Sequence, residues 1–66
     1  IKENYLKAIQ YYTEVITLLP AHHEAFLNRG YAFLKTNDMS EACSDWIQSN
    51  KLGNKIARNN ILIYCN

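Results

Sequence analysis

The feature that constrains this chain most is a spaced set of small and aromatic residues in its middle third. The set consists of Phe26-x-x-Arg29-Gly30-x-x-Phe33 followed by Ala42-x-x-x-Trp46. Spacings of three and four residues place the members of each group on one face of a helix. Small residues let two helix axes approach closely, and large aromatic residues fill the space around them. The pattern therefore predicts two helices packed as an antiparallel hairpin over 25–52.

Turn and capping signals mark the ends of these two helices. Asn37 tolerates the left-handed conformation that ends a helix. Asp38 can accept hydrogen bonds from the free amides of the next helix, and Glu41, three residues on, would complete an acidic capping box. Gly53 ends the second helix because glycine adopts positive φ without steric cost. The predicted helices are His22–Lys35 and Met39–Lys51.

The same register of residues occurs earlier in the chain. Ala8-x-x-x-Tyr12 stands 34 residues before Ala42-x-x-x-Trp46, and Asn4 stands at the same distance before Asp38. A repeated order of cap, small residue and aromatic residue indicates an internal repeat, and this period is that of tetratricopeptide arrays. We therefore expect a further helix over Tyr5–Leu19, capped by Asn4 and ended by Pro20.

On these residues the chain resembles a tetratricopeptide repeat (TPR) protein. The family pattern is Trp-x-x-Leu-Gly-x-x-Tyr, then Ala-x-x-x-Phe, then Pro. This chain departs from it at Arg29, where the family has Leu, and at Asn54, where the family has Pro. The resemblance covers 4–54. It implies an all-α fold, in which antiparallel helical hairpins form a TPR-like right-handed α-solenoid of about four helices.

The resemblance also implies how a single TPR-like domain over 1–66 is divided. Residues 4–20 would be the second helix of a partial repeat, 21–53 a full repeat, and 54–66 a capping helix that closes the stack. The expected apolar side of the cap is Ile56, Ala57, Ile61, Tyr64 and Cys65. This ending resembles the C-termini of short bacterial TPR proteins. Because repeat arrays generally need three or more units, we expect a fragment or processed domain of a longer protein.

Composition narrows the class of partner. The net charge is +1 and charged residues make up 20% of the chain, which provides no field to steer nucleic acid or an anionic membrane. No apolar run approaches the roughly 20 residues of a membrane span. The sequence therefore predicts no nucleic-acid partner and no membrane span.

Catalysis, cofactors and metal ions are not expected either. The chain shows no nucleophile paired with a base and no phosphate-binding loop. His22 and His23 are adjacent, so on a helix their side chains point about 100° apart. No His-x-x-x-His or Cys-x-x-Cys spacing accompanies them. We read both histidines as exposed residues of a first helical turn.

The resemblance implies that the first helix of each repeat lines a concave groove. Carried onto this sequence, the groove positions are Glu24, Leu27, Asn28, Tyr31, Leu34 and Lys35. This mixed surface could hold an extended peptide or a partner helix, which predicts a non-catalytic protein–protein interaction module. The other interpretation is that the apolar members only contact the neighbouring repeat.

A second hypothesis concerns the first helix. Its apolar face is larger than one neighbouring helix would cover, and an exposed apolar patch usually marks an interface. The residues proposed for self-association are Leu6, Ile9, Tyr12 and Ile16, on a face that also holds Val15 and Leu19. The chain would then be a structural scaffold unit that forms homo-oligomers. Alternatively, the following hairpin covers this face alone.

Several residues of the hairpin have individual predictions. Trp46 is expected in the core, whereas Asp45, Gln48 and Lys51 are expected to face water. Arg29 either pairs with an acidic neighbour or lies in the groove.

The two cysteines lie at similar distances on either side of the turn at 53–54. With a rise of about 1.5 Å per residue, Cys43 and Cys65 sit at nearly the same height in an antiparallel pair. They form either a disulfide or two packed free thiols. A bridge would suit an exported or periplasmic protein rather than a cytoplasmic one, so the compartment stays open.

Overall fold

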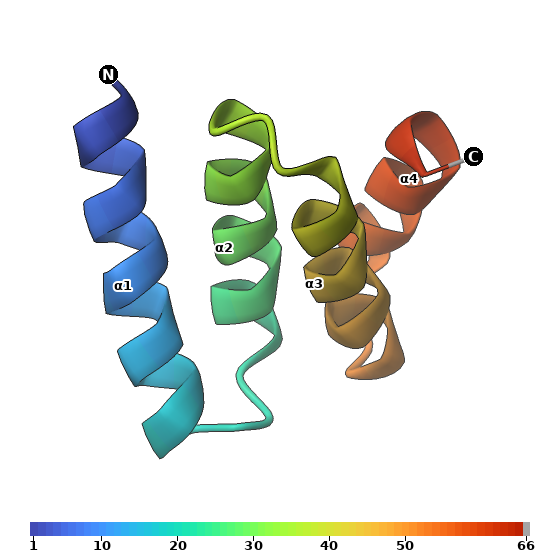
Figure 1. Cartoon of the computed structure of the whole chain (residues 1–66). Coiled ribbons are helices and arrows are strands. Elements are labelled where there is room, and N and C mark those ends of the chain that lie inside the picture. Colours follow the sequence, from blue (N-terminus) through green and yellow to red (C-terminus); the bar gives the residue numbers. More distant parts are fainter. Residues whose placement is uncertain (66) are drawn as a thin grey trace.

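The computed structural model describes residues 1–65, which form four α-helices. Their bounds are α1 Lys2–Leu18, α2 His23–Lys35, α3 Met39–Lys51 and α4 Lys55–Tyr64. Successive helices run antiparallel and follow one another across the molecule, so α1 and α4 lie at opposite ends (Figure 1). The expected all-α fold is confirmed. Asn66, the last residue of the expected cap segment, lies outside the described residues.

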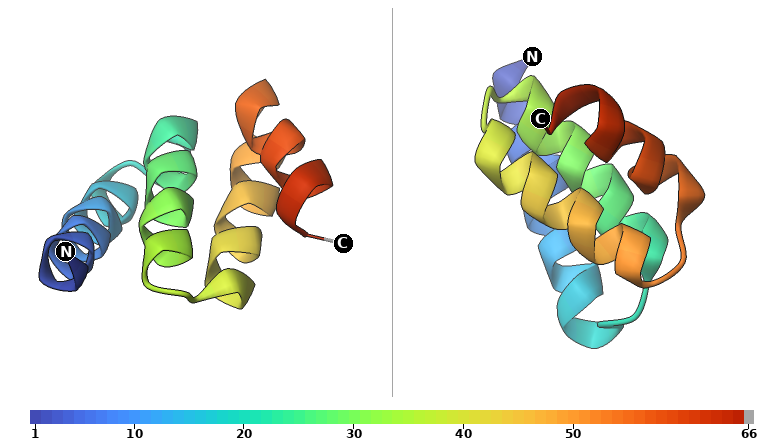
Figure 2. Two further views of the ribbon diagram at one scale, coloured as in Figure 1. Left: turned by 90° about the horizontal axis from the view of Figure 1, so that it is seen from above. Right: turned by 90° about the vertical axis from the view of Figure 1, so that its right-hand side faces the viewer.

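Each helix packs mainly on the one before and the one after it. The two further views of the ribbon place α2 between α1 and the α3–α4 pair (Figure 2). The predicted helices over 22–35 and 39–51 agree with α2 and α3 to within one residue. No helix of the described part of the chain combines the length and the apolar character that crossing a membrane requires.

Three of the helix boundaries follow the predicted physical chemistry. Asn37 has a φ of 66° and Gly53 a φ of 102°, so the chain turns in the left-handed region after α2 and after α3. Asn54 caps α4, because its Oδ1 accepts a hydrogen bond from the Ala57 amide at 2.9 Å. The cap of α2 was not predicted. It is His22, whose ring nitrogen Nδ1 accepts a hydrogen bond from the Ala25 amide at 3.1 Å.

Two predicted caps are wrong. The helix α1 already begins at Lys2, where the Asn4 and Tyr5 amides bond to the Ile1 carbonyl, so Asn4 lies inside the helix. Asp38 occupies the cap position of α3 but its side chain accepts no capping hydrogen bond. The Asp38 amide donates to the Phe33 carbonyl at 2.8 Å, which leaves no capping box to complete.

The core of the hairpin is built around Trp46. Its side chain is fully buried, and its indole N–H donates to the Leu27 carbonyl at 3.2 Å. A Cβ placed on Gly30 would lie 2.7 Å from Trp46 Cδ1, so the close approach of α2 and α3 requires glycine at that position. Trp46, Leu27, Ala42 and Ala57 form one buried cluster. Trp46 is confirmed as a core residue.

The helix α4 is attached to the rest of the fold at both ends. At its start, the side-chain nitrogen Nδ2 of the cap residue Asn54 contacts His23 Nδ1 on α2 at 3.0 Å. Beside it, Ser49 Oγ on α3 donates to the same residue's carbonyl at 2.8 Å and joins α3 to α2. At its end, a disulfide joins Cys65 to Cys43 on α3, with the two Cα atoms 5.9 Å apart. These contacts hold α4 alongside α3.

The face that α4 turns to the core differs from the predicted one. Ala57 and Asn60 are buried, and Ile61 and Cys65 are half-buried. Ile56 was expected on this side, but it lies in the first turn of α4 and is exposed, whereas the polar Asn60 is buried.

The helix α1 is the least buried element. It contains no buried residue, since it packs mainly on one neighbour, α2. Three of its four proposed self-association residues, Ile9, Tyr12 and Ile16, are half-buried, whereas Leu6 remains 50% exposed. The hairpin thus covers part of the apolar face of α1 and leaves part of it open.

Candidate functional site

A groove runs between α1 and α2 and is open to solvent. It has a volume of about 260 Å³. We call it the tyrosine groove. Its lining residues are Tyr5, Ala8, Tyr12, Asn28, Tyr31, Ala32 and Lys35.

Helical spacing explains how both helices supply this lining. On α1, Tyr5, Ala8 and Tyr12 recur at intervals of three and four residues, so they share one face. The small side chain of Ala8 leaves room between the two tyrosine rings. The opposite wall comes from α2, where Asn28 and Tyr31 are three residues apart. The groove therefore follows from the register of two packed helices and contains no loop residue.

The Tyr31 ring packs against a ring of the core. It lies edge-on to the Trp46 ring, with centroids 5.7 Å apart and an interplanar angle of 68°. Such edge-to-face pairs are favourable because the positive edge of one ring meets the negative face of the other. Tyr31 is still 37% exposed, so a rigid ring with a polar hydroxyl is available at the groove.

Three of the six predicted groove residues come together in the tyrosine groove: Asn28, Tyr31 and Lys35. Glu24 is exposed in the first turn of α2 but does not line it. Leu27 is buried in the core cluster, and Leu34 packs against that cluster. The prediction is wrong for these two leucines because their side of α2 meets α3 and the core.

The sequence reasoning missed the contribution of α1. Tyr5 and Ala8 were not predicted at a binding surface, and Tyr12 was predicted at a self-association surface. The i, i+3, i+7 spacing of these residues was a signal that they share a face. What the spacing alone did not show is that this face borders the polar side of α2.

A second cluster of polar groups joins three helices. The Arg29 guanidinium donates two hydrogen bonds to the Asp45 carboxylate, from Nε at 2.8 Å and from Nη2 at 2.7 Å. Its third nitrogen, Nη1, donates to Thr13 Oγ1 on α1 at 3.1 Å. Arg29 therefore pairs with an acidic neighbour, which is one of the two predicted alternatives. The expectation that Asp45 faces water is wrong, because this pairing buries it to 4% exposure.

The surroundings of Arg29 favour its charged form. Its guanidinium carbon lies 5.7 Å from the centroid of the Phe26 ring and 5.8 Å from that of Phe33. The hydrogen bond to Asp45 raises the pKa of Arg29 above its ordinary value, although burial acts in the opposite direction. Since every one of these groups has a partner inside the chain, the cluster is a bridge between helices.

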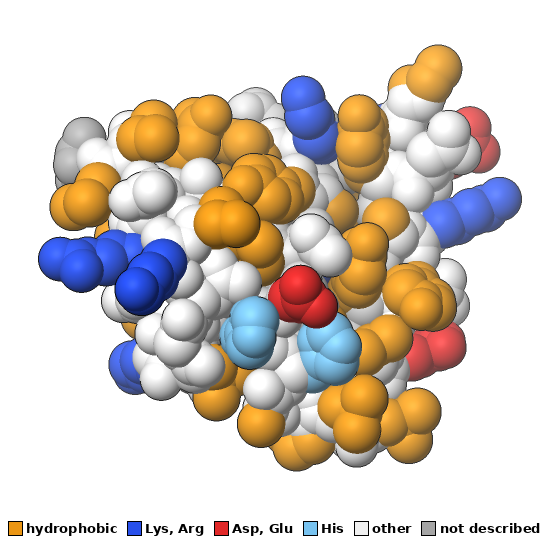
Figure 3. Space-filling view, turned by 180° about the vertical axis from the view of Figure 1, so that it is seen from behind, with side chains coloured by type: hydrophobic (Ala, Val, Ile, Leu, Met, Phe, Trp, Pro, Cys, Tyr) orange, Lys and Arg blue, Asp and Glu red, His pale blue; other side chains and the backbone are white. Residues whose placement is uncertain are grey.

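The two histidines make contacts within the chain. His22 and His23 each use Nδ1 within the chain, to cap α2 and to contact Asn54. Both histidines show on one face of the molecule (Figure 3). His23 is exposed as predicted, whereas His22 is half-buried by its capping role. Within residues 1–65, no group of three or more His, Cys, Asp and Glu side chains is placed to hold a metal ion.

The chain matches no protein-family model, no curated protein and no solved structure. Its resemblance to tetratricopeptide repeats therefore stays a prediction from the sequence. The tyrosine groove is the candidate site, because it brings together three of the predicted groove residues.

Proposed function

We propose that this chain is a non-catalytic interaction module that holds a peptide or protein segment in the tyrosine groove. The observation that carries the proposal is the convergence of Tyr5, Tyr12 and Tyr31 with Asn28 and Lys35 in one open hollow between two helices. The finer assignment, a TPR-like right-handed solenoid, is part of the same proposal. It is supported by the 34-residue register of the sequence and by the antiparallel order of the helices.

The chemistry of the lining suits a peptide. Tyrosine provides a large apolar contact area at a low cost in conformational entropy, together with a hydroxyl that can hydrogen-bond. The Asn28 amide can donate to and accept from a peptide backbone at once. Lys35 adds an ammonium group at one end of the groove, which would pair with a carboxylate on the bound segment.

The exposed side of α2 also gives the bound segment a direction. Glu24, Asn28, Tyr31 and Lys35 recur at intervals of four, three and four residues, so they form one line along the helix. With a rise of about 1.5 Å per residue, this line is roughly 16 Å long, which is the length of about five residues of extended chain. A segment with a basic residue near Glu24 and an acidic residue near Lys35 would complement both ends.

The experiment that tests the proposal is a selection of linear peptides from a displayed random library against the folded chain. For a selected peptide, we expect Tyr31→Ala to weaken binding at least tenfold while the circular dichroism spectrum keeps its helical signal. Ile47→Ala is the control, because Ile47 is exposed on α3 and does not line the groove. Peptides that bind wild type and Tyr31→Ala equally well would contradict the proposal.

A second candidate function is self-association through α1. The observation that favours it is Leu6, which is 50% exposed on the same apolar face of α1 as the half-buried Ile9. The chain would then act as a structural scaffold unit in a homo-oligomer. A solution mass that falls on dilution would support this alternative, and a monomer throughout the dilution series would exclude it.

A further inference from the structure

We infer that the Cys43–Cys65 disulfide is a redox latch, which keeps α4 docked over Trp46 and releases it when the bond is reduced. The inference does not depend on the proposed peptide-binding function. It rests on the position of the bond, on the side chains that α4 turns inward, and on those that it turns outward.

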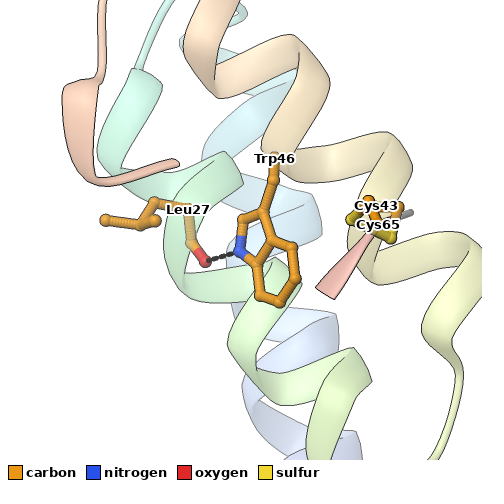
Figure 4. The surroundings of a disulfide bond; sticks show 4 residues. All are labelled: Leu27, Cys43, Trp46 and Cys65. Carbon is orange, nitrogen blue, oxygen red and sulfur yellow. Dashed lines mark hydrogen bonds between the residues drawn. A yellow bond between two sulfur atoms is a disulfide. The ribbon is translucent and has the colours of Figure 1, made fainter. Parts of the chain in front are cut away.

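The bond sits where α4 meets the buried tryptophan. Cys65 directly follows Tyr64 and is the C-terminal cap of α4, while Cys43 is one turn before Trp46 on α3. The close-up places the bridge beside the Trp46 side chain (Figure 4). The Tyr64 ring lies over Trp46 with centroids 5.5 Å apart. A movement of Cys65 therefore carries with it the ring that covers the tryptophan.

The inner face of α4 buries no large side chain completely. Its two buried residues are Ala57, which is small, and Asn60, which is polar. Its larger inward side chains, Ile61 and Tyr64, touch the core but stay partly exposed. The Asn60 amide nitrogen Nδ2 is buried without a hydrogen-bond partner among the described residues. A buried donor that has lost its water without gaining a partner opposes docking.

The outer face of α4, by contrast, carries large apolar side chains. Ile56 is 57% exposed, and Leu62 and Ile63 are each 65% exposed. Burial of such side chains is the main favourable term in helix docking, and here these three contribute little of it. The side-chain contacts of α4 therefore favour its docked position weakly, and the covalent bond supplies the remaining constraint.

The position of the disulfide is also compatible with its reduction. It closes a loop between cysteines 22 positions apart, which restricts the freedom of α4 to leave α3. Both cysteines are half-buried rather than enclosed. Cys43 also lines an open hollow of about 580 Å³ along α3, so one of the two bridged residues borders solvent.

The release step is thiol–disulfide exchange with a dithiol. A thiolate of the dithiol attacks one sulfur of the bridge, and the other cysteine leaves as a thiolate and takes up a proton. The second thiol of the dithiol then attacks the mixed disulfide, which frees the first cysteine. The bridge gains two electrons and two protons, and the dithiol becomes a disulfide.

The test is amide hydrogen exchange of the whole chain before and after reduction with dithiothreitol, with thiol titration to confirm the two states. We expect the amides of 58–64 in α4 to exchange roughly 100-fold faster after reduction, as a cross-link over a loop of this size predicts. The amides in the middle of α2 should keep their rates. Emission from Trp46, the single tryptophan, should shift to longer wavelength because Tyr64 no longer covers it.

A double variant provides the control. The variant Cys43→Ser/Cys65→Ser should show the fast exchange of α4 without reductant and should not respond to dithiothreitol. Three results would overturn the inference: free thiols in the protein purified without reductant, exchange rates in α4 that change less than threefold, or equal acceleration in α2 and α4. The last result would make the bond a staple of the whole fold.

Discussion

At the scale of single residues, Gly30 shows how one position decides the packing of two helices. Any side chain at this position would overlap the Trp46 indole, which is already fixed by its hydrogen bond to Leu27. The packing of this glycine against the helix that carries the tryptophan could be predicted from the sequence, because both residues stand at regular helical spacing. Interiors are packed too densely to absorb an added carbon atom without a shift of the surrounding groups.

We therefore expect Gly30→Ala to lower the free energy of unfolding by about 1–3 kcal/mol through overpacking. Gly53→Ala is the informative comparison, because a Cβ there meets no atom within 4 Å and only the positive φ opposes it. Its expected cost is about 1–2 kcal/mol from backbone strain. Urea denaturation of both variants measures the two values. A Gly30→Ala protein as stable as wild type would show that Trp46 can move aside.

Asp45 illustrates what the sequence could not show. Its position on α3 is compatible with a solvated face, and its partner Arg29 lies 16 positions away on another helix. Whether such a pair meets depends on the rotation of two helices about their axes, which no local pattern specifies. The prediction for Asp45 was wrong because tertiary packing decided it.

We expect Asp45→Asn to destabilise the chain by about 2–3 kcal/mol, since removal of one partner leaves the Arg29 charge half-buried and uncompensated. Arg29→Leu/Asp45→Ala, which removes both charges, should recover much of this loss. A raised pKa stabilises the fold below the ordinary pKa of arginine, and this contribution is lost only as the pH rises through the folded value. Arg29 stays charged at both pH 6 and pH 9. The loss of unfolding free energy caused by Asp45→Asn should therefore be the same at these two pH values. A single variant as stable as wild type in urea would contradict this account.

At the scale of helices, the C-terminal ends of α2 and α3 and the start of α4 were predictable because each carries its own chemical signal. Asn37, Gly53 and Asn54 adopt the conformations or bonds that their side chains favour. The start of α1 was not predictable in the same way, since Ile1 caps it without any side-chain bond. The inward face of α4 was misjudged because Asn60, a polar residue, is buried there.

The open side of α1 gives the prediction at this scale. If α1 pairs with a second copy, Leu6→Glu should abolish the dimer, because a buried carboxylate without a partner is costly. Leu6 is preferable to Ile9 for this test, since Ile9 is half-buried against α2 and its replacement would disturb the fold itself. Sedimentation equilibrium over a dilution series measures the mass. A Leu6→Glu protein that still dimerises would exclude this face as the interface.

At the scale of the whole molecule, the chain is a short row of helices with an open groove at one end and a bridged helix at the other. The all-α architecture could be predicted from helical spacing and from the 34-residue register. The tyrosine groove could be predicted only in part, because α1 supplies one wall and α2 the other. How these two helices meet is not visible in either helix alone. Asn28, Tyr31 and Lys35 follow from the exposed side of α2, whereas Tyr5 and Tyr12 join them through the angle at which α1 packs.

The measurement that tests the central claim most directly is a pair of amide correlation spectra of the chain, recorded with and without a library-selected peptide. Our account predicts that the amides whose resonances shift cluster on the facing sides of α1 and α2, around Tyr12, Asn28 and Tyr31. The amide resonances of α4 should not shift. Shifts confined to α4 or to the open side of α1 would contradict it and would place the binding surface elsewhere on the molecule.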